Sequence, residues 1–147
     1  MEKKIIPNEL LLGEVSRLVA DGETVTIMTK GSCMLPFIRG ERDSVVLERP
    51  EELKPGMIVL AFVDGCRYVL HRIISVEGDV VTLMGDGNIA GVERCRLNDI
   101  KAVAVQILTP RKQIDCMSRS HLRLAAIWKS MLPVRRWILA VYRRIFI

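Results

Sequence analysis

The sequence has no run of about 18 or more uncharged apolar residues, the length that a helix needs to cross a bilayer. Its first residues, MEKKIIPNELLLGEV, begin with basic side chains, but polar and acidic residues interrupt the apolar run that a secretory signal peptide requires. Neither a membrane-spanning helix nor a secretory leader is therefore predicted.

Cysteines are few and widely spaced, at Cys33, Cys66, Cys95 and Cys116. No two of them are close in the sequence, and no histidines accompany them at the spacing of a zinc site. The spacing predicts neither a metal centre nor a dense disulfide framework, and we expect no cofactor. Reduced thiols are the rule in the cytoplasm, so we expect a cytoplasmic protein.

Acidic residues are almost absent from the C-terminal part of the chain. Residues 110–147 contain nine Lys and Arg and only Asp115 as an acid, whereas residues 1–109 carry 13 basic and 16 acidic residues. The net charge of +5 thus combines a slightly acidic body with a strongly basic tail. We expect an anionic partner for the tail, with a lipid surface favoured over nucleic acid.

The 147 residues, half of them apolar, suit one domain with at most a small appendage. A capped amphipathic helix is predicted from Pro7-Asn8 to about residues 21–22. Short β-type segments follow, separated by turn residues, and their even spacing predicts a mainly β (α+β) domain with an antiparallel sheet over residues 1–110. The predicted strands are 24–29, 44–49, 57–63, 67–77, 80–85 and 101–108.

After Pro110 the pattern predicts helix, with Pro133 starting or breaking a second segment. On a helical wheel of residues 134–147, four arginines share one half, while Trp, Tyr, Phe and aliphatic side chains fill most of the rest. A basic amphipathic tail over residues 111–147 suits contact of residues 118–147 with a membrane surface, and it also suits packing on the β domain. The arginines are Arg135, Arg136, Arg143 and Arg144.

Three short segments contain residues suited to catalysis, and each alone has an ordinary structural explanation. GSCMLP (31–36) suits a turn with Cys33 as a small buried side chain. His71 alternates with Val69 and Ile73 in a predicted strand, where a single histidine is usually a core or cleft residue. GDGN (85–88) suits a tight turn. The three together, in this order, indicate a site.

These segments resemble the motifs of the signal peptidase and LexA-type self-cleaving repressor superfamily. In GSCMLPFIRGERDSVVL, Gly31, Met34 and Pro36 match the family pattern Gly-any-Ser-Met-any-Pro, and LKPGMIVLAF resembles its Gly-Asp-Ile-Val strand with Met57 in place of Asp. VLHRIISVEG and LMGDGN resemble the His-Arg-Ile and Lys-Gly-Asp-Asn segments of the archaeal, sporulation-type and endoplasmic-reticulum signal peptidases, with Met84 in place of the lysine. The similarity covers about residues 24–108 and implies a LexA/signal-peptidase-like antiparallel β catalytic domain.

The resemblance also implies catalytic roles. Cys33 stands at the nucleophile position, His71 at the general base, and Asp86 at the acid that orients His71 or supports the site. A free thiol with a pKa of about 8.5 is mostly protonated at neutral pH, so a nearby imidazole is needed to take its proton. Supporting or oxyanion roles fall to the Cys33 N–H and to Ser32, Arg72 and Glu93.

The chain departs from the family pattern at two of these positions. The family nucleophile is serine, whereas this chain has Cys33. The histidine-type enzymes carry a second acid six residues beyond the Gly-Asp aspartate, and Val92 stands there, with Glu93 one step later. An intact site therefore needs Glu93, or Asp86 alone.

Two functions are consistent with these residues. The first is a signal-peptidase-like endopeptidase that cuts an extended peptide or protein segment with a Cys33–His71 dyad, in a setting such as maturation of a secreted or modified peptide. The alternative is a catalytically impaired peptide-binding module of the same fold. A DNA-linked repressor switch is disfavoured, because about 30 residues before Cys33 are too few for a helix-turn-helix domain, and we expect no nucleic acid partner. Without an apolar anchor, membrane association is expected to be peripheral, and the oligomeric state is left open.

Overall fold

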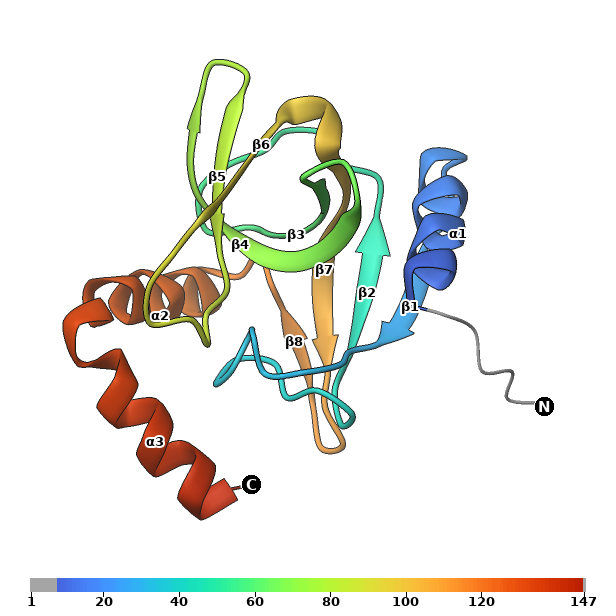
Figure 1. The fold of residues 1–147 in the computed structure, drawn as a ribbon. Helices are drawn as coiled ribbons and strands as arrows, with labels where there is room; N and C mark the ends of the chain where they lie inside the picture. Colours follow the sequence, from blue (N-terminus) through green and yellow to red (C-terminus); the bar gives the residue numbers. More distant parts are fainter. Residues whose placement is uncertain (1–7, 147) are drawn as a thin grey trace.

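The computed structural model describes residues 8–146. An eight-stranded antiparallel sheet curls through the molecule in the order β1-β2-β7-β3-β4-β5-β6, with β8 paired to β7 (Figure 1). Three α-helices complete a mainly β, α+β architecture, as predicted. The strands are β1 (Val25–Met28), β2 (Ser44–Glu48), β3 (Ile58–Val63), β4 (Arg67–Glu77), β5 (Val80–Met84), β6 (Glu93–Arg96), β7 (Ile100–Leu108) and β8 (Gln113–Asp115). The helices are α1 (Asn8–Ala20), α2 (Arg119–Ser130) and α3 (Arg135–Phe146), with the 3-10 helices η1 (Leu97–Asp99) and η2 (Leu132–Val134).

The sheet curls because its ladders contain irregularities. Register shifts occur at Val46/Leu47 in β2, at Leu60/Ala61 in β3 and between residues 73 and 75 of β4. Each such bulge bends its strand and increases the local twist. Strand β4, with 11 residues, pairs with both β3 and β5.

Apolar side chains cover both faces of the curled sheet. Helix α1 places Leu12, Val15 and Val19 against one face, in a cluster with Leu60 and other buried side chains. A second cluster contains Val59, Ile73, Val81, Leu83 and Val103. The alternation between the two clusters follows the two-residue period of a strand, so adjacent residues of β3 enter different clusters.

Local sequence patterns predicted the longer elements correctly. The helix ends at Ala20, as expected, and begins at Asn8, whereas Pro7 of the predicted Pro7-Asn8 start lies outside the described residues. All six predicted strands are present. Strand β6 was not predicted because its sequence, ERCR, carries three charges and places only Cys95 in the core.

The helical prediction was wrong for residues 113–115. These residues form β8, which pairs with the end of β7 through Gln106↔Asp115 and Leu108↔Gln113. Three residues are too few for a strand to stand out in the sequence, and the pairing depends on the reversal of the chain at residues 109–112. The sheet therefore extends beyond residue 110, the predicted end of the β domain.

The tail beyond β8 is helical and packs on the domain. Pro133 lies in η2, between α2 and α3, as expected. Trp128 of α2 and Leu139 of α3 are buried with Leu35 in a third apolar cluster. Arg135, predicted to share the arginine face of the helix, is instead buried, with 3% of its surface exposed. Within residues 8–146, no helix is long and apolar enough to span a membrane.

Candidate active site

Cys33 lies in the loop between β1 and β2, and this loop is closed at its base by Thr29 and Asp43. The Thr29 N–H donates to the Asp43 carbonyl oxygen at 3.0 Å, and the Thr29 hydroxyl donates to the same oxygen at 2.8 Å. The fully buried Asp43 carboxylate accepts from the Arg39 N–H at 2.9 Å and from Arg42 Nε at 2.7 Å. These bonds hold the ends of the loop together and limit the positions available to Cys33.

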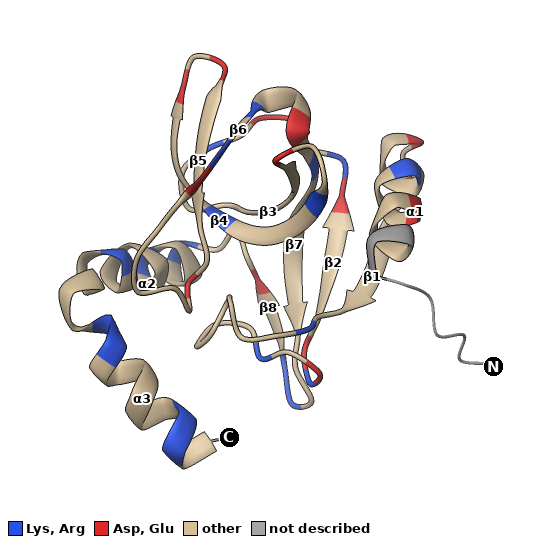
Figure 2. Cartoon of the chain, viewed as in Figure 1, with Lys and Arg blue, Asp and Glu red and all other residues tan. Residues whose placement is uncertain are grey.

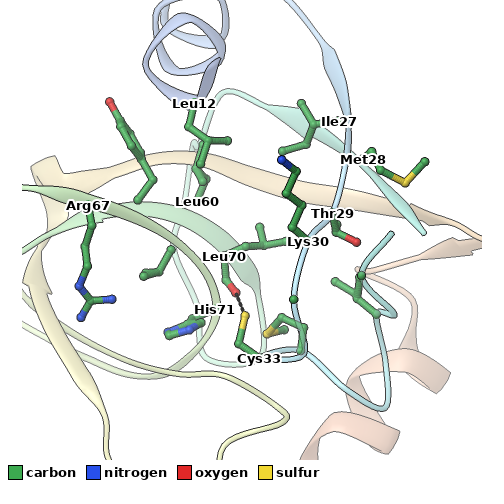
Figure 3. Close-up of a pocket in the computed structure, with 16 residues that line it drawn as sticks. Leu12, Ile27, Met28, Thr29, Lys30, Cys33, Leu60, Arg67, Leu70 and His71 are labelled. Carbon is green, nitrogen blue, oxygen red and sulfur yellow. Dashed lines mark hydrogen bonds between the residues drawn. The ribbon is translucent and has the colours of Figure 1, made fainter. Parts of the chain in front are cut away.

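Cys33 and His71 line the same cavity, of about 300 Å³. Figure 3 shows the thiol and the imidazole on the same side of the cavity, with Cys33 contributed by the loop and His71 by β4. The Cys33 thiol donates a long hydrogen bond to the Leu70 carbonyl oxygen, with the sulfur 3.8 Å from the oxygen. The structure thus places the two residues proposed as a dyad in one cavity, where the hydrogen bond of the thiol goes to Leu70 rather than to His71. Apolar walls come from Leu12, Ile27, Leu60 and Leu70, and cationic side chains from Lys30 and Arg67.

Both members of the pair favour their uncharged forms. Burial lowers the pKa of His71 below its ordinary value, because a buried imidazolium loses its hydration. Burial likewise raises the pKa of the Cys33 thiol, and the negative charge of Asp86 adds to this rise. The His71 Nδ1 atom is buried and has no hydrogen-bond partner among the described residues. At rest the cavity therefore contains a protonated thiol and a neutral imidazole rather than a thiolate and an imidazolium.

Glu93 acts on His71 by charge rather than by contact. Its negative charge favours the protonated imidazole, whereas the positive charge of Arg67 opposes it. Glu93 and Arg67 form an ion pair with each other. Arg67 was not proposed as a site residue, although the period of a strand predicts that it shares a face of β4 with Val69 and His71. Glu93 is thus near His71 and is held by Arg67.

Asp86 is paired with Arg72 and not with His71. Arg72 Nε lies 2.9 Å from Asp86 Oδ1 and Arg72 Nη2 lies 2.7 Å from Asp86 Oδ2, and both side chains are about 95% buried. Burial raises the pKa of Asp86, and the Arg72 guanidinium offsets part of that rise. Of the two roles implied for Asp86, this geometry matches support of the site rather than orientation of His71. Arg72 also donates to the Gly56 carbonyl oxygen at 2.8 Å.

The GDGN turn supports the backbone of the Cys33 loop directly. The Gly87 N–H donates to the Cys33 carbonyl oxygen at 2.7 Å. A Cβ atom at Gly85 would lie 2.4 Å from that oxygen, and one at Gly87 would lie 2.2 Å from the Ser32 carbonyl oxygen. Such distances are far below van der Waals contact, so both positions require glycine. The glycines of this turn thus allow the backbone of one proposed motif to pack against the backbone of another.

Side chains of α2 and α3 donate hydrogen bonds to the backbone of the GDGN turn. Trp128 Nε1 donates to the Asp86 carbonyl oxygen at 2.6 Å. Arg135 donates to the carbonyl oxygens of Asn88 at 2.9 Å and of Trp128 at 3.1 Å, and its guanidinium lies over the Trp128 ring at 5.0 Å. The sequence did not predict that Trp128 and Arg135 support this turn, because the contacts with Asp86 and Asn88 join positions more than 40 residues apart and no local pattern marks them.

His121 of α2 also contacts this region, through a hydrogen bond with Arg72. Arg72 Nη1 lies 3.2 Å from His121 Nε2, and arginine only donates, so Nε2 must be the unprotonated acceptor of a neutral imidazole. Burial, and then the positive charge of Arg72, lower the pKa of His121 to about 4.

The titration of His121 predicts a loss of stability in mild acid. Because the unfolded chain binds this proton near pH 6.5 and the folded chain only near pH 4, the contribution is complete above pH 6.5 and is lost as the pH falls toward 4. The loss should amount to about 3 kcal/mol in the free energy of unfolding. The measurement is urea unfolding of the wild type and of His121→Gln at several pH values. The free energy of unfolding of the wild type, minus that of His121→Gln, should fall by this amount as the pH is lowered. A difference that is independent of pH would contradict the assignment.

The remaining predicted features lie at the edge of the site. The Ser32 hydroxyl accepts a hydrogen bond from Arg143 of α3 at 3.4 Å and does not line the Cys33 cavity. The Cys33 N–H, predicted as an oxyanion donor, makes no hydrogen bond to another residue among residues 8–146, and its interaction with the thiol of the same residue offsets in part the rise that burial causes in the thiol pKa. All four cysteines are free thiols. The described part of the chain contains no cluster of three or more His, Cys, Asp or Glu side chains placed to hold a metal ion.

A scan against protein-family models finds no match to this chain, and a search of curated proteins finds no similar sequence.

Proposed function

We propose that this protein is an endopeptidase of the signal-peptidase type, with Cys33 as nucleophile and His71 as general base. The observation that carries the proposal is that these two side chains, from separate motifs, line one cavity. We propose further that the curled β domain is a LexA/signal-peptidase-like catalytic domain. Support comes from two of the motifs that resemble this superfamily, which line that cavity, and from a third, the GDGN turn, which is hydrogen-bonded to the backbone of the Cys33 loop.

In the proposed mechanism, a peptide lies extended along β1, which is an edge strand with free backbone groups. His71 takes the thiol proton as the sulfur attacks the scissile carbonyl carbon. The free Cys33 N–H stabilises the oxyanion. Collapse of the tetrahedral intermediate transfers the proton from His71 to the leaving amine and leaves a thioester on Cys33, which water then hydrolyses with His71 as base.

The alternative, a peptide-binding module without turnover, is favoured by the state of the thiol. The raised pKa of Cys33 keeps it protonated, and its hydrogen bond to the Leu70 carbonyl directs the proton to that oxygen rather than to His71. In this alternative, the site still binds a peptide in its groove, but Cys33, which stands where the resembled family has serine, attacks the peptide slowly or not at all.

Incubation with a peptide library made by digesting a whole proteome separates the two functions, with new termini identified by mass spectrometry. If the protein is a peptidase, the wild type produces new termini that are absent with Cys33→Ala. The matched control is Cys66→Ala, which removes an exposed thiol elsewhere and should produce the same termini as the wild type. Equal cleavage by Cys33→Ala contradicts the dyad. If no variant cleaves, and Cys33→Ala retains peptides with unchanged affinity, the binding module is correct.

A further inference from the structure

Helix α3 carries an apolar stripe that the domain does not cover. Trp137, Val141 and Ile145 follow one another at intervals of four residues, and 67%, 56% and 66% of their surfaces are exposed. On another side of the same helix, Arg135 and Leu139 are buried against the domain. Packing on the domain therefore accounts for one face of α3 and leaves the stripe in contact with solvent.

The charged residues of α3, and of the chain that leads into it from residue 116, are all basic or histidine. No Asp or Glu occurs in residues 116–146, and Arg136, Arg143 and Arg144 of α3 are exposed. Figure 2 shows the basic residues of α2 and α3 without an acidic residue on either helix. Exposed large apolar side chains also occur on α2, at Leu124 and Ile127.

We propose that the stripe formed by Trp137, Val141 and Ile145 seats α3 on the surface of an anionic lipid bilayer. An amphipathic helix with Trp and aliphatic side chains on one face and arginines beside them is suited to the region between headgroups and acyl chains. The arginines supply the attraction to anionic lipid. Two other partners fit less well. A second copy of this chain would bring the same positive charge to the contact and be repelled, and nucleic acid would leave the apolar stripe exposed to water. The inference does not depend on the proposed peptidase activity.

Docking through the stripe would also set the position of the candidate site. The buried face of α3 touches the Cys33 loop, because Leu139 packs with Leu35 and Arg143 donates to the Ser32 hydroxyl. The helix that lies on the bilayer is thus the helix that supports this loop. This consequence, unlike the docking itself, rests on the proposed function: Cys33 would then act close to the membrane surface, on peptide segments that lie beside it.

Flotation of the full-length protein with vesicles tests the proposal. The wild type should float with vesicles that contain phosphatidylglycerol and much less with pure phosphatidylcholine vesicles. The triple variant Trp137→Ser/Val141→Ser/Ile145→Ser should bind at least about tenfold more weakly, since three apolar side chains no longer enter the bilayer. Arg144→Gln should bind about fivefold more weakly, the loss expected for one cation near an anionic surface. The matched control, Val80→Ser/Ile89→Ser, removes comparably exposed apolar side chains from elsewhere and should bind like the wild type.

Tryptophan fluorescence provides a second measurement that needs no substitution of the stripe. Trp137 is exposed and Trp128 is 7% exposed, so insertion of α3 should shift the emission to shorter wavelength mainly through Trp137. Absence of both flotation and shift in the wild type overturns the proposal, as does undiminished flotation of the triple variant. Concentration-dependent dimerisation that the triple variant abolishes would assign the stripe to self-association instead.

Discussion

Substitution of His71 by glycine should lower kcat/KM for peptide cleavage by about a thousandfold, within the range that a positioned general base contributes. The thiol is uncharged at rest because burial raises its pKa, so attack requires a base in the same cavity. We propose His71 as this base, since it lines the same cavity and burial lowers its pKa, which keeps the imidazole neutral. The measurement is the cleavage rate of a peptide identified in the library experiment, before and after addition of free imidazole.

Added imidazole should restore part of the activity of His71→Gly, because a small base can enter the space that the side chain leaves. The matched control is Cys33→Ala, in which the nucleophile is missing and imidazole should have no effect. In the wild type, kcat/KM should rise with pH through the His71 pKa, which lies below its ordinary value of 6.5. An acid limb centred above pH 6.5, or full activity in His71→Gly, would contradict this role.

Replacement of Asp86 by alanine should lower the free energy of unfolding by about 3–5 kcal/mol, the cost of leaving one partner of a buried ion pair without its counter-charge. Only 4% of the Arg72 side chain is exposed, so water cannot hydrate the guanidinium that Asp86 now neutralises. The measurement is urea unfolding at neutral pH. The matched control is Asp79→Ala, because Asp79 is 60% exposed and lies 3.9 Å from Arg96, and it should change stability by less than about 0.5 kcal/mol.

The double variant Arg72→Met/Asp86→Ala distinguishes an ion pair from a purely steric role of Asp86. Removal of both charges leaves no buried cation without a partner, so the double variant should be more stable than Asp86→Ala alone. Additive losses would indicate that the two side chains act independently. If Asp86→Ala were as stable as the wild type but failed to cleave, Asp86 would act on His71 in the reaction rather than support the turn.

The sequence alone predicted the features that depend on local patterns. A β-type run between turn residues marked β4, and the two-residue period of a strand placed His71 on the same face as Val69 and Ile73. The short strands β6 and β8 escaped prediction because they are stabilised by pairing with β5 and β7 rather than by their own pattern. Sequence motifs also singled out Cys33, His71 and Asp86, because chemistry restricts which residue types can stand there.

Tertiary structure decided how those residues are partnered. It placed Cys33 and His71 in one cavity, but it paired Asp86 with Arg72. His71 and Arg72 are neighbours in the sequence, and the direction in which each side chain leaves the strand determines which of them Asp86 meets. It also placed Arg135 of the basic tail under the GDGN turn. The amphipathic pattern of α3 was visible in the sequence, whereas only packing showed that Leu139 meets the domain and that Trp137 meets solvent. A periodic pattern determines that a helix has an apolar face, and long-range contacts determine how much of that face is already occupied.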